Sequence, residues 1–266
     1  MEIVSSEISS SNQEVDEIIT KRDDKKLLEI CKRQIYYGAD RLAVNCATRI
    51  NTEVEDMEWL VRTIHANLEI PLMPDTPNAY AIEAALKHNK FGRPLVDSIT
   101  CERNRIELIM PMVKEYNASV VVLLHGNRKI SETLEERLEC MNTVEKVAIE
   151  YNMNKKDMIL DCIMAPLSTN SNSGIVYINC LKTLKDKYPN YSYTCGLDNI
   201  SYGLPKEELL NITMTMMLFA LGQEYLFTNV TKESRAFIKT AKALCGEDNY
   251  TLDYIKAFRN KELNIF

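Results

Sequence analysis

Three aspartates and one asparagine each follow a short apolar run in this chain. They are Asp75 in PLMPD, Asp97 in PLVDS, Asp161 in MILDC and Asn199 in YTCGLDN. Where such runs alternate with amphipathic helices they are strands of a parallel sheet, and these residues then lie at the carboxyl ends of the strands. A (β/α)8 barrel has its active site at that edge. Because no lysine or arginine accompanies the carboxylates, the pattern predicts a cradle for a neutral heterocycle rich in hydrogen-bond donors.

Eight short apolar segments alternate with helical patterns along the chain. The expected strands are residues 2–8, 41–46, 71–75, 94–98, 119–125, 158–163, 191–197 and 224–228. The segment SVVVLLH is typical of a strand buried on both faces. The alternation continues through 266 residues without a break in composition. It predicts an α/β protein, a (β/α)8 TIM barrel forming a single domain over residues 1–266, and the GxGxxG motif of an open doubly wound sheet is absent.

Local signals predict where several helices begin. Thr52 with Glu55, and Thr133 with Glu136, have the spacing of capping boxes. Pro77 is expected in the first turn of the helix AYAIEAALKH, because the first turn leaves its N–H groups without helical partners.

The composition is typical of a globular protein that stays in water. Hydrophobic residues make up 45% and charged residues 26%, and the net charge of −6 disfavours partners such as nucleic acid or an anionic membrane. No stretch approaches 18 uninterrupted apolar residues, and Met1 is followed by Glu2 rather than by a basic and then apolar leader. The eight cysteines are scattered singly, without CxxC or zinc spacing. We therefore expect a cytoplasmic protein with reduced thiols and no metal site.

Several motifs in the same order suggest a family. They are MEWLV (57–61), the aspartate of PLMPD, the strand ending at position 97, CER (101–103), the aspartate of ILD (159–161), GLDNISYGLP (196–205) and LLN (209–211). Together they resemble the pterin-binding methyltransferases, dihydropteroate-synthase-like barrels that move a methyl group between N5 of tetrahydrofolate and the cobalt of a corrinoid protein. The resemblance implies tetrahydrofolate or 5-methyltetrahydrofolate as substrate, cobalamin carried by a separate corrinoid protein, and a homodimer.

The resemblance also implies roles for single residues. Asp161 would bind the 2-amino/N3 edge of the pterin, Asp75 an N–H near N8, and Asp97 the pyrazine and pyrimidine nitrogens. Asn199 would hydrogen-bond N5 and is the catalytic candidate, because an amide can both donate and accept. Further candidate pterin contacts are Gly196, Ser201 and Tyr202, and possible ones are Asn45 and His125.

Each candidate also has a purely structural interpretation. Asp75 could cap the next helix. Asp97 could pair with Arg103 or Arg105. Asn199 could be a turn residue, Tyr202 a packing residue and His125 a hydrogen-bonded residue of the rim. The histidines on helices, His65 and His88, are expected to be exposed.

The chain also departs from the family pattern. The usual Glu-Arg-Ile-Asn of strand one is replaced by Ser-Glu-Ile-Ser at residues 6–9, the Asp-x-Asn of strand two keeps only Asn45, and position 97 is usually Asn. Three functions stay open: a tetrahydrofolate/corrinoid methyltransferase, a degenerate barrel that binds a folate or docks the corrinoid protein without turnover, and dihydropteroate synthase. The last is disfavoured because LFTNVTKES offers only Lys232 for pyrophosphate. Since the chain contains no Asp-x-His-x-x-Gly sequence, the cobalt must arrive on a partner.

Overall fold

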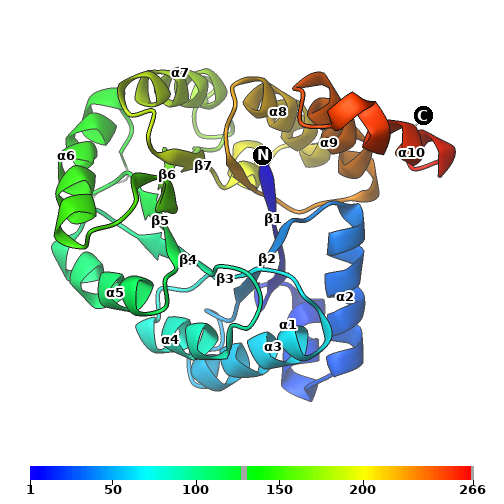
Figure 1. The fold of residues 1–266 in the computed structure, drawn as a ribbon, viewed down its shortest axis with the longest axis horizontal. Helices are drawn as coiled ribbons and strands as arrows, with labels where there is room; N and C mark the ends of the chain where they lie inside the picture. The colour runs from blue at the N-terminus through cyan, green and yellow to red at the C-terminus, as the bar shows by residue number, and fades with distance from the viewer. Residues whose placement is uncertain (127–130, 265–266) are drawn as a thin grey trace.

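Eight parallel strands surrounded by helices form a (β/α)8 barrel in the computed structural model, which describes residues 1–126 and 131–264 (Figure 1). The strands are β1 (Glu2–Ser9), β2 (Arg41–Asn45), β3 (Leu72–Pro74), β4 (Leu95–Ile99), β5 (Ser119–Leu123), β6 (Met158–Asp161), β7 (Ser192–Thr194) and β8 (Tyr225–Phe227). All eight lie within the segments that the sequence predicts or extend them by one residue.

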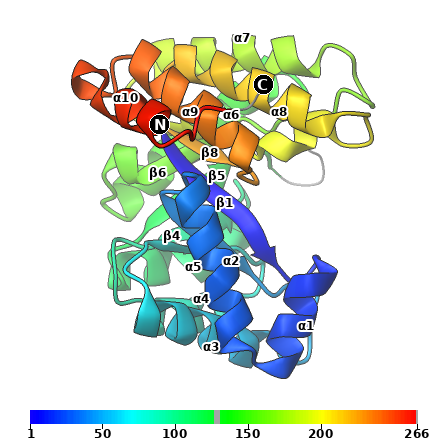
Figure 2. The same cartoon turned by 90° about the vertical axis from the view of Figure 1, so that its right-hand side faces the viewer.

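The helices follow the strands in turn. They are α1 (Gln13–Lys21), α2 (Asp24–Tyr37), α3 (Glu53–Asn67), α4 (Ala79–His88), α5 (Arg103–Glu115), α6 (Leu134–Glu150), α7 (Ser173–Lys187), α8 (Glu207–Ala220), α9 (Lys232–Leu244) and α10 (Leu252–Arg259), with short 3-10 turns η1 (Lys155–Asp157), η2 (Leu197–Ser201) and η3 (Asn249–Thr251). In the side view, α10 packs beside α9 at the edge of the molecule (Figure 2). Within the described residues, no helix combines the length and the apolar character needed to cross a membrane.

The barrel consists of two four-stranded sheets joined at two seams. The orders are β3-β2-β1-β8 and β4-β5-β6-β7, and every pairing is parallel. One seam is a single bridge between Asp75 and Asp97, and the other is a single bridge between Gly196 and Phe227. Both seams therefore contain residues predicted to form the site.

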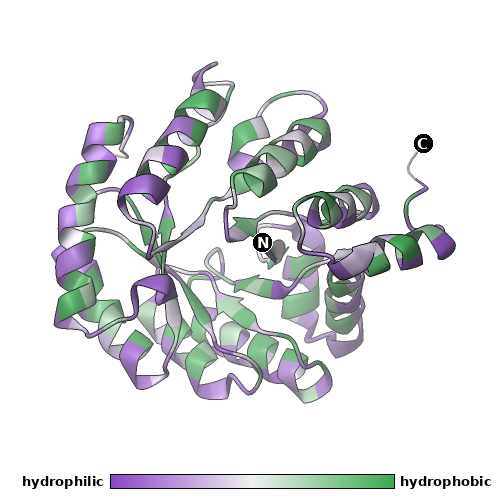
Figure 3. Cartoon of the chain, turned by 45° about the horizontal axis from the view of Figure 1, so that its top comes forward, coloured by the Kyte–Doolittle hydropathy of each residue, from purple (hydrophilic) through white to green (hydrophobic). Residues whose placement is uncertain are grey.

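The inside of the barrel has an apolar layer below a polar one. The apolar layer is a separate buried cluster of Val4, Ala43, Met73, Leu95, Val121 and Ile159. Side chains two positions apart on a strand share a face. The same inner face of β2, β3, β4 and β6 therefore continues to Asn45, Asp75, Asp97 and Asp161. Figure 3 shows largely hydrophobic strands inside a ring of helices that alternate between hydrophobic and hydrophilic residues.

The helix predicted after Thr52 is present, but its capping box and the predicted place of Pro77 are wrong. The capping box of Thr133 and Glu136 is confirmed at α6. Thr52 does precede α3, but its side chain makes no capping bond and instead donates to Asp56 Oδ2 at 2.6 Å. Pro77 lies before α4 rather than in its first turn, because Asn78 caps this helix.

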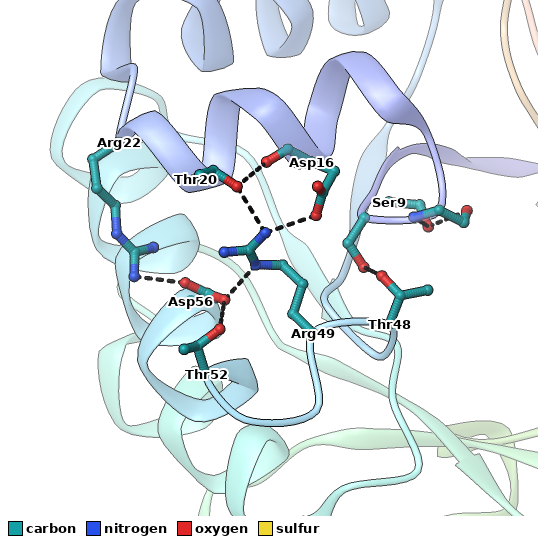
Figure 4. Close-up of polar contacts among 10 residues, drawn as sticks. Ser9, Asp16, Thr20, Arg22, Thr48, Arg49, Thr52 and Asp56 are labelled. Atoms are coloured by element: carbon teal, nitrogen blue, oxygen red, sulfur yellow. Dashed lines mark hydrogen bonds and ion pairs between the residues drawn. The ribbon is translucent and has the colours of Figure 1, made fainter.

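A buried ion-pair network explains why the Thr52 capping box does not form (Figure 4). The Asp56 side chain is 1% exposed and contacts Arg22 at 2.5 Å and Arg49 at 2.6 Å. Arg49 also binds Asp16 of α1 at 2.7 Å. A buried carboxylate needs such partners, and it draws the Thr52 hydroxyl as well. The network ties α1 to the loop between β2 and α3.

The expectation of an exposed His65 is wrong. The side chain is buried, and its Nδ1 accepts the backbone N–H of Lys90 at 3.1 Å. Nε2 therefore carries the proton and donates to the carbonyl of Ile70 at 3.0 Å. Burial lowers the pKa of His65, so the neutral ring acts as a structural connector. His88 is partly exposed.

Candidate active site

A cavity of about 280 Å³ opens at the carboxyl ends of the strands of the second sheet. Its lining contains five of the predicted residues, namely Asp97, His125, Asp161, Gly196 and Asn199, together with Ser98, Val121, Leu123, Ile163, Met164 and Phe227. The volume is near the lower end of the roughly 300–1,000 Å³ typical of small-ligand sites. Its walls are apolar with a few polar groups, which suits a flat heterocycle.

Asp75 lies behind the cavity and is joined to it through Asp97. The two carboxyl groups are hydrogen-bonded to each other, and Asn45 Nδ2 donates to Asp75 Oδ2 at 3.0 Å. A hydrogen bond between two carboxyls requires a proton on one of them. Burial raises the pKa of both, and the charges of Asp75 and Asp161 raise that of Asp97 further, to well above its ordinary value. These shifts favour a proton shared by the pair, and the hydrogen bond from Asn45 reaches Asp75 from outside the cavity.

Asp161 is held by its own loop. Its Oδ1 accepts the backbone N–H of Ile163 at 2.6 Å, and it also accepts the N–H of Gly196. Burial nevertheless raises the pKa of Asp161 to about 6. Ile163 adopts a φ of 60°, which is strained for a β-branched residue. Asp161 thus has a structural role beside the predicted one, and its other lone pairs remain available for a ligand.

Asn199 lies on η2 with its side chain exposed at the cavity. Among the described residues, no hydrogen bond satisfies its amide. Gly196 permits this position, because a Cβ there would lie 3.2 Å from Asn199 Nδ2. Ser201 and Tyr202 of the same motif do not line the cavity. The Ser201 hydroxyl is buried and donates to the carbonyl of Asp198 at 3.2 Å, and the Tyr202 side chain is 72% exposed.

Asp97 does not form the ion pair with Arg103 or Arg105 that a purely structural role would require. Arg103 pairs with Glu107 and Glu150. Arg105 donates to the backbone carbonyls of Thr76, Pro77 and Ser98. In the part of the chain that the structure describes, no lysine or arginine forms an ion pair with the three site carboxylates. Buried carboxylates without an ion-pair partner favour protonation or a ligand that donates hydrogen bonds.

His125 and the apolar lining complete the cavity. His125 lies at the rim, and its backbone carbonyl accepts the N–H of Cys101 at 2.9 Å. The apolar walls were not predicted from the sequence. Val121 and Leu123 of β5 and Phe227 of β8 could have been found from the two-residue alternation of inward side chains. Ile163 and Met164 lie in an irregular loop, and no sequence signal marks them.

The fold and the cavity define a (β/α)8 barrel with a small-ligand site at the carboxyl ends of its strands. Residues 9–222 match the family described as pterin binding enzyme, and the chain belongs to this family.

Individual relatives agree with this assignment. The chain is 26% identical over 268 residues to a methylcorrinoid:tetrahydrofolate methyltransferase of Eubacterium limosum, covering 99% of this chain and 98% of that protein. A methionine synthase of Mycobacterium leprae is 27% identical over 199 residues, 71% of this chain but 16% of that protein.

Solved structures show the same fold. Dihydropteroate synthase of Clostridium difficile with pteroic acid superposes with a TM-score of 0.67 at 16% identity, over 91% of this chain and 96% of that one. The Yersinia pestis enzyme with a pterine-sulfa conjugate gives 0.69 at 12% identity, over 92% and 94%. At these identities the likeness concerns the fold alone.

Proposed function

We propose that this protein transfers a methyl group between N5 of tetrahydrofolate and the cobalt of a corrinoid protein, in one-carbon or demethylation metabolism. The observation that carries the proposal is the cavity shared by Asp97, Asp161 and Asn199 in a barrel of the pterin-binding family. The full-length similarity to the Eubacterium limosum methyltransferase supports it. The whole chain, residues 1–266, would form this one catalytic domain.

The carboxyl groups would bind and orient the pterin. Asp161 accepts from the 2-amino/N3 edge with the lone pairs that Ile163 and Gly196 leave open. The protonated pair of Asp75 and Asp97 offers a donor and acceptors to the ring nitrogens, as an amide would. Val121, Leu123 and Phe227 exclude water from the faces of the ring. These contacts bind the substrate and the product alike.

Asn199 would act on the reacting atom. Departure of the methyl group to cobalt(I) requires a proton on N5, which solvent can supply and from which the Asn199 carbonyl oxygen can accept a hydrogen bond. In the reverse direction the N5 lone pair takes the methyl group from methyl-cobalt(III) and the N5 proton returns to solvent, while the Asn199 amide, after a small rotation, keeps a hydrogen bond to N5. The absence of an internal partner for this amide, in the part of the chain that is described, leaves it free to make both contacts. The cobalt of the partner protein accepts or supplies the methyl group.

A second candidate function is binding without turnover. It is favoured by the first two strands, where Ser6–Ser9 and Ala43 replace the usual polar signature. Dihydropteroate synthesis is less well supported, because the described residues that line the cavity include no lysine or arginine for pyrophosphate.

An anaerobic methyl-transfer assay separates the candidates. We expect methyl-cobalamin mixed with tetrahydrofolate and the protein to show the absorbance change of methyl loss from cobalt. Asn199→Ala should slow this step by about one to three orders of magnitude, the scale of a lost preorganised hydrogen bond, while affinity for tetrahydrofolate falls less. If the protein binds tetrahydrofolate but no spectral change occurs, even with a cognate corrinoid protein, the result would favour the second candidate function, binding without turnover.

The oligomeric state and the compartment belong to the same proposal. All eight cysteines are free thiols, which fits a reducing cytoplasm. We propose a homodimer, and sedimentation velocity on the purified chain tests it. A single species at the monomer mass across micromolar concentrations would reject it.

A further inference from the structure

Asp198, the residue before Asn199, connects η2 to two other parts of the barrel. Its Oδ1 accepts from Asn211 Nδ2 at 2.9 Å and from Thr228 Oγ1 at 2.8 Å. Its Oδ2 accepts the backbone N–H of Asn229 at 3.1 Å. Asn211 belongs to α8, and Thr228 and Asn229 follow β8. One carboxylate thus joins three segments beside the cavity.

The side chain of Asn211 has no hydrogen-bond partner other than Asp198 among the described residues. Asn211 Oδ1 is buried and has no hydrogen-bond partner in the part of the chain that is described, so the bond to Asp198 alone orients this amide. Asn211 ends the LLN motif, to which the pterin contacts assign no role. A carboxylate that accepts three hydrogen bonds from two separate segments restrains them more than one neutral bond would.

We call the three hydrogen bonds of Asp198 the anchor of η2. The anchor matters because the other hydrogen bonds that hold Asn199 in place are long. Its backbone N–H donates to the Gly196 carbonyl at 3.4 Å, and its carbonyl accepts from Tyr202 N at 3.3 Å, both long bonds. Its side chain is exposed at the cavity. The place of the Asn199 amide relative to Asp161 and Asp97 therefore depends on what fixes η2 to the barrel.

We propose that Asp198 is a positioning residue that, through Asn211 and Thr228, sets the place of the Asn199 amide in the cavity. The inference rests on the proposed function. Asp198 does not line the cavity, so it would influence the reaction step without contributing to pterin affinity. A displacement of about 1 Å in a reacting group can slow a reaction by about 100-fold.

The test compares Asp198→Ala with Asp186→Ala, a change of an exposed aspartate near the end of α7 whose side chain forms no hydrogen bond or ion pair in the described structure. We expect Asp198→Ala to lower the single-turnover rate of methyl transfer by about ten- to 100-fold. Tetrahydrofolate affinity should stay within about twofold, because only the reaction step is affected. Asp186→Ala should behave like the wild type. Thr228→Val removes one bond of the anchor and should cause a smaller loss of rate if Asp198→Ala does not fold.

A double variant distinguishes positioning from an independent effect. If Asp198 acts through Asn199, adding Asp198→Ala to Asn199→Ala should cause no further loss of rate. An equal loss in both backgrounds, or a wild-type rate in Asp198→Ala, would overturn the inference.

Hydrogen exchange tests the anchor without turnover. The amides of residues 197–202 should exchange faster in Asp198→Ala than in Asp186→Ala, since η2 loses its connections. Unchanged exchange would also reject the positioning role. A wild-type protein that shows no methyl transfer would instead refute the proposed function, and exchange would still decide whether Asp198 holds η2.

Discussion

At the scale of single residues, the carboxyl pair of Asp75 and Asp97 gives the site a proton. The family usually has asparagine at position 97, and a protonated carboxyl can offer the same donor and acceptor. The sequence predicts that both aspartates lie at strand ends. It does not predict their hydrogen bond, because that contact exists only where β3 and β4 meet at the seam.

The pair predicts a pH dependence of folate binding. The pKa of Asp97 is raised, so the carboxyl is a donor at low pH and loses its proton as the pH rises through that pKa. Asp75 and Asp161 add negative charge nearby, His125 lies at the rim, and Arg105 on α5 partly offsets them. Tetrahydrofolate affinity should therefore fall with rising pH. Calorimetry above pH 7 measures this, because Asp161, with a pKa raised to about 6, is already ionised there. Asp97→Asn should be insensitive in that range, and an equally steep profile in this variant would contradict the assignment.

Gly196 gives a second prediction at this scale. A methyl group there would lie 3.2 Å from Asn199 Nδ2, so the amide must move by a few tenths of an ångström. We expect Gly196→Ala to slow methyl transfer by about tenfold or more with little change in folding stability. Gly174→Ala is the control, because the nearest atom to its added methyl is 4.0 Å away. Equal rates in the two variants would show that Asn199 does not depend on this close approach.

At the scale of elements, the strands could be predicted, whereas the capping of two helices could not. Continuous apolar runs such as residues 119–123 mark buried strands regardless of their neighbours. The hydrogen bond that a capping side chain makes depends on the tertiary partners near it. At α3 the Thr52 hydroxyl donates to the buried Asp56 and makes no capping bond. Local spacing contains no information about these partners.

The Asp56 network predicts a large stability effect. Asp56→Ala removes the carboxylate shared by Arg22 and Arg49, so both guanidinium groups lose this ion-pair partner. Breaking a buried ion pair costs about 3–5 kcal/mol, and we expect about 2–3 kcal/mol because both arginines reach solvent. Urea unfolding measures the change. Glu58→Ala breaks an exposed pair with Arg62 and should lower the free energy of unfolding by less than about 1 kcal/mol. A similarly small loss in Asp56→Ala would mean that the network is not stabilising.

At the scale of the whole molecule, the cavity lies between the two seams of the barrel. A ligand that contacts Asp97 and Asn199 touches residues at or next to both seams, so its binding should stabilise the contacts between the two sheets. We expect tetrahydrofolate to slow exchange of the Thr76 and Phe227 amides, which bond across the seams to Asp97 and Cys195. The amide of Val120 in β5, a residue that does not line the cavity, is the internal control. Protection confined to the loops around the cavity would argue against this coupling.

The same seams have a consequence for how the chain folds. One sheet, β4 to β7, comes from a continuous stretch of sequence, whereas the other needs β8 to pair with β1, joining Glu2 to Tyr225. Contacts between distant parts of a chain form late, because a long loop must close first. A growing chain that has not yet made β8 lacks the Gly196–Phe227 bridge and one wall of the cavity. The binding site would thus become complete only with the last strand, and a nascent chain would have no assembled pocket to offer a folate.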